Sequence, residues 1–306
     1  MNEIKNVLIC GIGAIGSIYA YKINKFNSNN LKILVDEKRL EKYTKTPKIF
    51  NGNVLNLNYV LPENTDFKAD LIIIATKFDG LKEAINNIKN FIKKDTIILS
   101  LLNGVTSEEI IASKYGWDHI LLSYFIGSSA MRDDNKIIHN GIGTIVFGSK
   151  DNSQQEDTKL VKDFFDKVEI DYKIPEDMLR AYWLKYMLNV SSNQLSAILN
   201  MTFGDMQSNS NARDLLKKIM EEVKQIAIAQ GVKNTQTMID EAFEIFDKMT
   251  KEGRTSMLQD IQAKRQTEVE MFAGTMIEFG KKYSIPTPYN LAIYDLINIM
   301  QQNYKN

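Results

Sequence analysis

Short apolar runs alternate with helical stretches through the first half of the chain. Short runs typical of strands lie at residues 7–10 and 31–36, and solidly apolar runs lie at 70–76, 96–102 and 119–126. Runs of this length without polar alternation are typical of strands that are covered on both faces. Helical periodicity separates them near 79–92 and 106–114, and an amphipathic helix follows near 154–167. This alternation predicts a doubly wound, mostly parallel sheet of the Rossmann type.

Two predicted hairpins interrupt the alternation. The pair Asn51-Gly52 is a strong turn signal, so we predict a hairpin there. The run IIHNGIGTIVFG at 137–148 is predicted as a second hairpin. Both hairpins would be additions to the parallel sheet.

After Pro175 the pattern becomes almost continuously helical. A long helix is predicted from Pro175 to about residue 199, with proline at its start and acids in its first turn. The next helix is striped at four-residue spacing by Leu215, Ile219, Val223 and Ala227 and ends at Gly231. Further helices are predicted at 236–250, 256–283 and 289–303. We therefore expect a dinucleotide-binding domain over 1–172 and an all-α substrate domain over 173–306, with the site in the cleft between them.

Composition excludes several classes of protein. The 306 residues suit two domains, and 38 basic against 38 acidic residues leave no net field that favours nucleic acid or a membrane. The apolar runs are too short to span a bilayer, and the N-terminal residues lack a signal-peptide pattern. One cysteine, Cys10, excludes an intramolecular disulfide. We expect a cytoplasmic protein without nucleic-acid or membrane partners.

The first strand runs directly into a glycine-rich segment, VLICGIGAIGS at 7–17. Gly11 would permit the turn at the strand end, Gly13 a close approach of the backbone to a pyrophosphate, and Gly16 the packing of the following helix. The diphosphate would rest on free N–H groups at the helix N-terminus. An ordinary glycine turn is the alternative. The predicted cofactor-binding segment comprises Gly11, Ile12, Gly13, Ala14, Ile15 and Gly16.

A polar stripe lies on the first long helix of the second half. Lys185, Asn189 and Asn193 are four residues apart, and each step drifts only about 40° around a helix. They share one face, which is either a solvated surface or a site. Asparagine lowers helix propensity, which favours a site. Burial would lower the pKa of Lys185 toward the range of a working acid.

A second polar cluster, at 254–270, contains a hydroxyl and a carboxylate. On one straight helix the twelve-position separation of Ser256 and Glu268 would span about 18 Å, too far for both to touch one atom of a small ligand. They would flank a site or bind different groups around it. Each could also be a surface residue, and Ser256 a helix N-cap.

Two polar residues follow apolar strands directly. Lys77 and Asn103 lie just past strand ends, at the edge where open α/β sheets bind ligands, although each could be a plain loop residue. His119 and His139 are far apart in sequence, and the chain has no HxxxH or CxxC spacing. We therefore predict no metal site.

Together these segments resemble the ketopantoate reductase family (2-dehydropantoate 2-reductases) over nearly the whole chain. The resemblance is carried by GIGAIG at 11–16, TK at 76–77, LLNG at 101–104, WLKYMLNVSSNQLSAI at 183–198, TSMLQDIQAKRQTEVE at 255–270 and IPTP at 285–288. It implies that NAD(P)H reduces the C2 ketone of 2-dehydropantoate (ketopantoate) to (R)-pantoate, on the way to pantothenate.

The resemblance also implies roles for the polar residues. Lys185 resembles the general acid that protonates the carbonyl oxygen and stabilises the developing alkoxide. Glu268 matches a catalytic position that binds the substrate hydroxyl or orients the lysine. Substrate oxygens are held at the positions of Asn189, Asn193 and Ser256, and the cofactor–substrate junction is lined at those of Lys77 and Asn103.

The residue after the second strand departs from the family pattern. NADPH-preferring members often carry arginine there to pair with the 2′-phosphate, whereas this chain has Asp36. A carboxylate favours the ribose 2′-hydroxyl of NAD(H). Lys38 and Arg39 follow and could supply positive charge. The resemblance favours NADP(H), and the chemistry of Asp36 favours NAD(H).

Three further questions stay open at the level of sequence. The substrate could be another 2-oxo acid, reduced by the same residues in a different pocket. The chain could also be a dinucleotide sensor without catalysis, although such proteins typically lose the polar catalytic set. The apolar helical stripes permit a homodimer and equally describe the domain's own core.

Overall fold

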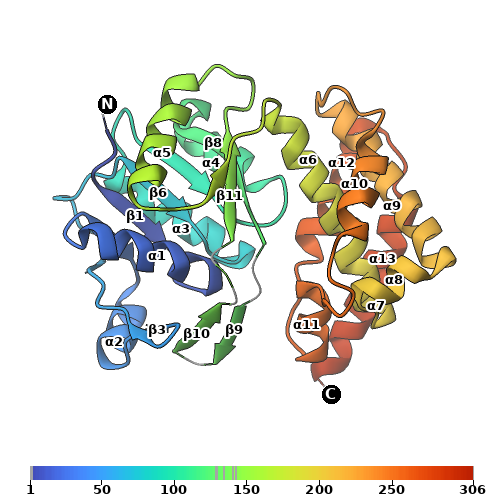
Figure 1. The fold of residues 1–306 in the computed structure, drawn as a ribbon, viewed down its shortest axis with the longest axis horizontal. Coiled ribbons are helices and arrows are strands. Elements are labelled where there is room, and N and C mark those ends of the chain that lie inside the picture. Colours follow the sequence, from blue (N-terminus) through green and yellow to red (C-terminus); the bar gives the residue numbers. More distant parts are fainter. Residues whose placement is uncertain (1–2, 128–129, 134, 140, 142, 306) are drawn as a thin grey trace. The chain divides into compact units, whose positions relative to one another are not determined.

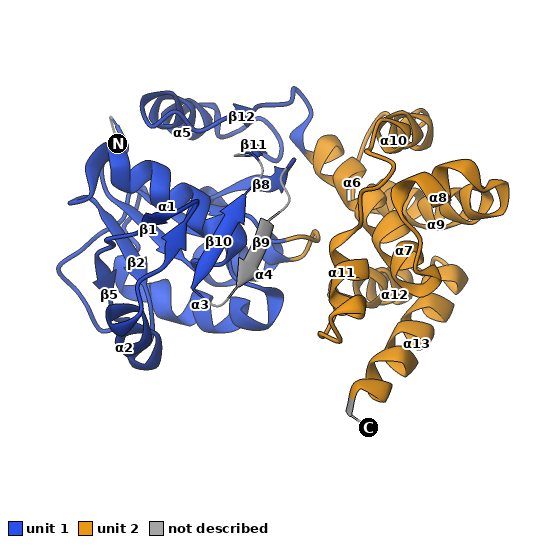
Figure 2. Ribbon diagram, turned by 60° about the horizontal axis from the view of Figure 1, so that its bottom comes forward, with its two compact units in different colours: residues 1–102, 107–178 blue, residues 103–106, 179–306 orange. Residues whose placement is uncertain are grey.

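The computed structural model describes residues 3–127, 130–133, 135–139, 141 and 143–305. Contacts divide the chain into two compact units, drawn in different colours in Figure 2. Unit 1 comprises residues 1–102 and 107–178, and unit 2 comprises residues 103–106 and 179–306. Residues 103–106, which connect a strand and a helix of unit 1, therefore belong to unit 2 by their contacts.

Unit 1 is organised around an eight-stranded sheet (Figure 1). Its strands are β1 (Val7–Cys10), β2 (Leu31–Leu34), β5 (Tyr59–Val60), β6 (Leu71–Ile74), β7 (Ile97–Ser100), β8 (Ile120–Ile126), β11 (Thr144–Gly148) and β12 (Tyr172–Lys173). They follow the order β12-β11-β8-β7-β6-β1-β2-β5. The six strands from β8 to β5 are parallel to their neighbours, and β11 is antiparallel to β8. This confirms the predicted doubly wound sheet, whose order reverses at β1 and β6.

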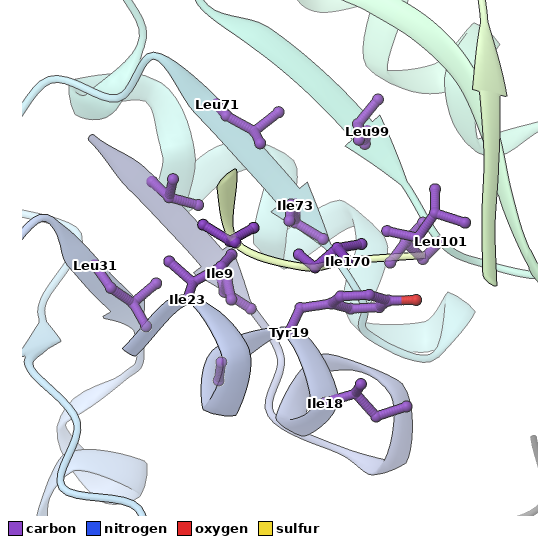
Figure 3. Close-up of a cluster of buried hydrophobic side chains, with 14 of the residues drawn as sticks. Ile9, Ile18, Tyr19, Ile23, Leu31, Leu71, Ile73, Leu99, Leu101 and Ile170 are labelled. Atoms are coloured by element: carbon purple, nitrogen blue, oxygen red, sulfur yellow. The ribbon is translucent and has the colours of Figure 1, made fainter. Parts of the chain in front are cut away.

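The helices of unit 1 connect these strands. They are α1 (Ala14–Asn27), α2 (Glu37–Lys45), α3 (Leu81–Asn87), α4 (Ser107–Tyr115) and α5 (Gln155–Lys167), with short 3₁₀ turns η1 (Phe78–Gly80), η2 (Ile88–Phe91) and η3 (Trp117–His119). Figure 3 shows part of the apolar cluster, in which Tyr19 and Ile23 of α1 lie beside Ile9 and Ile73 of the sheet. Burial of this cluster fixes the start of α1 against the ends of β1 and β6.

A smaller sheet orders β4 (Asn53–Val54), β3 (Ile49–Phe50), β10 (Lys136–His139) and β9 (Ala130–Asp133). Asn51 and Gly52 have φ angles of 45° and 81° between β3 and β4, as a two-residue hairpin turn requires, so the first predicted hairpin is confirmed. The second, at 137–148, is wrong because β10 pairs with β9 and β3 while β11 joins the main sheet. The alternating burial of β10 suits a sheet covered on one face, whereas β11 is almost fully buried.

Unit 2 is built from helices. They are α6 (Met178–Leu188), α7 (Gln194–Leu199), α8 (Phe203–Ser208), α9 (Ser210–Ala229), α10 (Met238–Asp247), α11 (Ser256–Gln262), α12 (Thr275–Tyr283) and α13 (Pro288–Gln302), with a 3₁₀ turn η6 (Asn303–Lys305). Two single π-helical turns, η4 (Asn189–Asn193) and η5 (Glu270–Gly274), complete the set. In the part of the chain that the structure describes, no helix is both long and apolar enough to cross a bilayer.

The predicted continuous helix over 256–283 is wrong. After α11 ends, Lys264 adopts a left-handed φ of 51°, and Arg265 Nε donates to the carboxylate of Asp260 at 2.7 Å. The N–H of Thr267 donates to Gln301 of α13 at 2.6 Å. These bonds take the place of the helical ladder, so residues 265–269 form an irregular segment before η5.

Candidate active site

The glycine segment lies where β1 passes into α1. Gly11 has a φ of +93°, and a Cβ there would lie 2.8 Å from the Ala75 carbonyl oxygen; a Cβ on Gly16 would overlap the Gly11 carbonyl oxygen. Gly13 differs, because a Cβ on it would meet nothing within 4 Å. Two glycines are therefore required by the chain's own packing, and Gly13 borders open space at the N-terminus of α1. That space fits a dinucleotide pyrophosphate, which must approach the backbone closely.

The other predicted members of this segment contribute differently. Ile12 is buried, and Ala14 and Ile15 are half-buried in the first turn of α1. The Ala14 carbonyl oxygen lies 2.7 Å from Nε2 of His139, which must carry the proton because a carbonyl only accepts. Burial lowers the pKa of His139 and favours this neutral form. His139 is far in sequence from the other candidate residues, so the sequence did not indicate this contact.

Asp36 lies beyond β2 as the N-cap of α2. Its carboxylate accepts from the backbone N–H of Arg39 at 2.6 Å and from the Arg39 guanidinium at 2.7 Å. Arg39 also lies 3.6 Å from Glu83, and its side chain remains half exposed. The charge of Asp36 is therefore balanced locally by a guanidinium that can change partners.

Lys77 lies beyond β6, at the point where the sheet reverses its order. It is exposed and precedes η1, two residues after Ala75, whose N–H donates to the Cys10 carbonyl at 2.8 Å. Lys77 and Gly11 therefore follow neighbouring parallel strands at the same sheet edge, which is where such sheets bind ligands. Outside residues 11–16, Asp36 and Lys77, the predicted site residues lie in unit 2.

A continuous chain of hydrogen bonds in unit 2 joins the predicted substrate-binding residues. Ser256 Oγ donates to Asn193 Oδ1 at 3.0 Å, Asn193 Nδ2 to Asn189 Oδ1 at 3.4 Å, Asn189 Nδ2 to Asn103 Oδ1 at 3.5 Å, and Asn103 Nδ2 to Glu268 Oε2 at 3.0 Å. We call these five residues the asparagine chain. Every bond is donated toward Glu268, so its carboxylate sets the orientation of each amide.

The break after α11 means that Ser256 and Glu268 do not share one straight helix. They join the asparagine chain at its two opposite ends. The alternative role of Ser256 as the helix N-cap is excluded, because Thr255 holds that position and accepts from the Leu258 N–H at 3.1 Å. The Ser256 hydroxyl is thus available to Asn193.

Lys185 lies in α6, one helical turn before Asn189. Its side chain is half-buried, and burial lowers its pKa from 10.5 to about 8. Among the residues that the structure describes, its ammonium has no hydrogen-bond or ion-pair partner. A lysine with this pKa can release a proton near neutral pH, which suits a general acid.

The π-helical turn η4 changes the helix geometry between Asn189 and Asn193, two of the three residues of the predicted polar stripe. Asn189 and Asn193 are its first and last residues, and both are buried. Because a π turn takes more residues than an α turn, residues four apart drift less around the axis, and the two side chains hydrogen-bond directly. Single π turns are frequent at functional sites. The described residues contain no group of three or more His, Cys, Asp or Glu that could hold a metal.

Comparisons with known proteins match one family over nearly the whole length of the chain. The family model described as "Ketopantoate reductase PanE/ApbA" matches residues 7–152, and the model of that family's C-terminal part matches residues 177–301. The 2-dehydropantoate 2-reductase of Streptococcus pyogenes serotype M3 is 28% identical over 300 residues, which cover 95% of this chain and 96% of that protein.

Solved structures share the fold. A D-mandelate dehydrogenase with NADH and anilino(oxo)acetate superposes with a TM-score of 0.85 at 24% identity, covering 98% of this chain and 100% of that one. A dimeric ketopantoate reductase from Staphylococcus aureus gives a TM-score of 0.76 at 22% identity, covering 98% of this chain and 99% of that one.

Proposed function

Since the chain belongs to the ketopantoate reductase PanE/ApbA family, we propose that it reduces 2-dehydropantoate to (R)-pantoate for pantothenate biosynthesis. As a member of this family it is an NAD(P)H-dependent oxidoreductase that acts on a 2-oxo acid. In the proposal, unit 1 binds the dinucleotide through residues 11–16 and Lys77, and unit 2 binds the substrate and supplies the acid.

The asparagine chain next to Lys185 is the observation that carries this proposal. A 2-oxo acid that also bears a hydroxyl offers several oxygen atoms, which need both donors and acceptors. The three asparagines retain a second amide hydrogen each, and Ser256 and Glu268 retain further acceptor capacity. Asn189 and Asn193 are buried in a helix, whereas polar residues that serve only solubility lie exposed on the surface.

The proposed chemistry assigns one proton to Lys185. A bound nicotinamide dinucleotide supplies the hydride that converts the ketone carbon into the carbinol carbon. Lys185 donates its Nζ proton to the carbonyl oxygen, and its positive charge stabilises the alkoxide as it develops. Asn189, Asn193 and Ser256 orient the substrate oxygens, and Glu268 accepts from the substrate hydroxyl. The lysine then regains a proton from water.

A substrate comparison tests this function. Rates of nicotinamide oxidation with ketopantoate, pyruvate and phenylglyoxylate should give the highest kcat/KM with ketopantoate. The third compound is included because a structural relative is a mandelate dehydrogenase, and phenylglyoxylate is the 2-oxo acid of mandelate. A higher kcat/KM with another acid would make the chain a reductase of that acid. Dinucleotide binding without turnover of any 2-oxo acid would make it a sensor.

The rate should fall in alkaline solution. Lys185 is protonated below its pKa of about 8 and neutral above it, so it loses its proton-donating form as pH rises. We expect kcat/KM to be flat from about pH 6 to 7 and to fall about tenfold per unit above about pH 8.5. Dinucleotide affinity, measured by fluorescence over the same range, is the control. A rate that stays constant up to pH 10 would assign the proton to another donor.

For the dinucleotide we propose NADPH, with Arg39 as the partner of the 2′-phosphate. The Arg39→Ala variant should raise the KM for NADPH at least about tenfold, because a charge-assisted pair contributes about 1.5–3 kcal/mol. The KM for NADH should stay within about twofold. The opposite result has two parts: the KM for NADPH is unchanged in Arg39→Ala, and the KM for NADH is raised in Asp36→Asn. It would identify Asp36 as a ribose ligand and NADH as the cofactor.

We also propose a homodimer that forms through the outer face of α13. Leu291, Leu296 and Ile299 are 50%, 47% and 58% exposed there, while Ile293 and Ile297 pack inward. An apolar helix face of this kind is typical of an interface, and the related reductase from S. aureus is dimeric. Light scattering should give about twice the 35.0 kDa chain mass, and Leu296→Lys should give the monomer. A wild-type monomer would overturn this.

A cytoplasmic location completes the proposal. Cys10, the one cysteine of the sequence, is buried at the end of β1 as a free thiol. The fold therefore uses no disulfide and suits a reducing compartment. Fractionation of cells that express the full chain would check this, and recovery from a membrane or secreted fraction would contradict it.

A further inference from the structure

Two π-helical turns flank the asparagine chain. The first, η4, contains Asn189 and Asn193; the second, η5, begins two residues after Glu268. The backbone of η5 holds Glu268 directly, since the N–H groups of Met271 and Phe272 donate to the Glu268 carbonyl at 3.0 and 3.3 Å. A shift of η5 would therefore move one end of the asparagine chain relative to the other.

One buried side chain ties the two π turns together. Gln194 is fully buried, directly after Asn193. Its Oε1 accepts from the N–H of Ala273 in η5 at 3.0 Å, and its Nε2 donates to the carbonyl of Val190 in η4 at 2.7 Å. Because the first partner can only donate and the second can only accept, the amide has one orientation.

The same amide continues to a buried carboxylate. Gln194 Nε2 lies 3.3 Å from Oδ1 of Asn290, and Asn290 Nδ2 donates to Glu222 at 2.7 Å. Glu222 also accepts from the N–H groups of Tyr289 and Asn290, at 2.7 and 3.1 Å, in the first turn of α13. The negative charge suits that helix terminus. Gln194 is thus anchored to α9 and α13 as well as to both π turns.

A second tie comes from the helix that carries the proposed acid. Tyr186, the neighbour of Lys185, is buried and donates its hydroxyl hydrogen toward the carbonyls of Met271 and Phe272, at 2.9 and 3.1 Å. These carbonyls belong to η5. The position of η5 is therefore set from α6 by Tyr186 and from η4 by Gln194.

We propose that Gln194 is a positioning residue of the reductase, a role that rests on the proposed function. It holds η5, and with it the Glu268 carboxylate, at the separation from Asn189 and Asn193 that the asparagine chain needs. The three oriented amides then keep their free N–H groups and lone pairs directed at the substrate. Gln194 itself touches neither substrate nor dinucleotide in this proposal.

The Gln194→Met variant tests the role, because methionine has similar length and lacks the amide. We expect kcat for the 2-oxo acid to fall about tenfold while the Kd for the dinucleotide stays within about twofold. The matched control is Gln230→Met. The side-chain nitrogen of Gln230 is buried and, among the described residues, has no hydrogen-bond partner, so that substitution removes no bond and should leave kcat unchanged. Unchanged kcat in Gln194→Met would overturn the proposal.

A double variant separates positioning from general stability. If Gln194 acts through the asparagine chain, Gln194→Met should cause little further loss in an Asn193→Ala background. A tenfold loss that persists in that background would show that Gln194 only supports the fold, which overturns the role. If Gln194→Met does not fold, Gln194→Asn replaces it, since its amide is one methylene too short to bridge the two turns.

Hydrogen exchange distinguishes failure of this inference from failure of the proposed function. The backbone amides of 268–274 should exchange faster in Gln194→Met than in the wild type, and equally in Gln230→Met. This measurement needs no substrate. A wild type that reduces no 2-oxo acid would contradict the proposed function, whereas unchanged exchange would contradict the role of Gln194.

Discussion

Replacing Lys185 with alanine is expected to lower kcat for the 2-oxo acid by about a thousandfold. The substitution removes the proton donor and the positive charge beside the developing alkoxide, and general acid catalysis alone contributes about 10²- to 10⁴-fold. The Kd for the dinucleotide should hardly change, because the proposed binding segment, residues 11–16, lies in unit 1. Steady-state oxidation of NADPH and fluorescence titration measure the two quantities.

Two further variants serve as controls for Lys185. Lys224→Ala removes a half-buried lysine that pairs with Glu221 on α9, and it should leave kcat unchanged. Lys185→Arg keeps the positive charge but supplies a group whose pKa is too high to release a proton readily. The activity that this variant retains would therefore measure how much of the rate comes from the charge and not from proton donation. Normal turnover in Lys185→Ala would refute its role as the acid.

The second large effect is expected at Glu268. Glu268→Ala should lower kcat/KM by about a hundredfold. The substitution removes a charged acceptor for the substrate hydroxyl and leaves Asn103 Nδ2 without the acceptor that orients the asparagine chain. Glu268→Gln can still accept from Asn103, so it should lose less, and the difference between the two variants measures the effect of the charge.

Glu270 offers a matched control two residues away. Its carboxylate is exposed and accepts from the Tyr294 hydroxyl at 2.6 Å, so Glu270→Gln should leave kcat/KM within about twofold. Equal losses of kcat/KM in Glu268→Gln and Glu270→Gln would mean that the segment is sensitive to any substitution and that Glu268 has no specific role. Full activity in Glu268→Ala would remove Glu268 from the mechanism.

Much of unit 1 could be predicted from local pattern. The apolar runs of β1, β2, β6, β7 and β8 are buried on both faces, so their hydrophobicity alone marked them as strands of a parallel sheet. The error at 137–148 has a different origin. A turn signal states that the chain bends, but the partner of each strand depends on which neighbouring edge buries it, and β10 and β11 found edges in different sheets.

The candidate active site divides in the same way. The sequence alone determined the need for glycine at Gly11, whose φ of +93° lies in the left-handed region, and at Gly16, where a Cβ would overlap the Gly11 carbonyl oxygen. It also determined that Lys185 and Asn189 share a helix face. The tertiary structure alone decided that Ser256 and Glu268 join one asparagine chain and that Gln194 ties η4 to η5. The Ser256–Asn193, Gln194–Ala273 and Asn103–Glu268 bonds link residues 63, 79 and 165 positions apart, and the last of them depends on the helix break made by Asp260 and Gln301. A periodic pattern records only which residues are near along one element, so it contains no information about such distant partners.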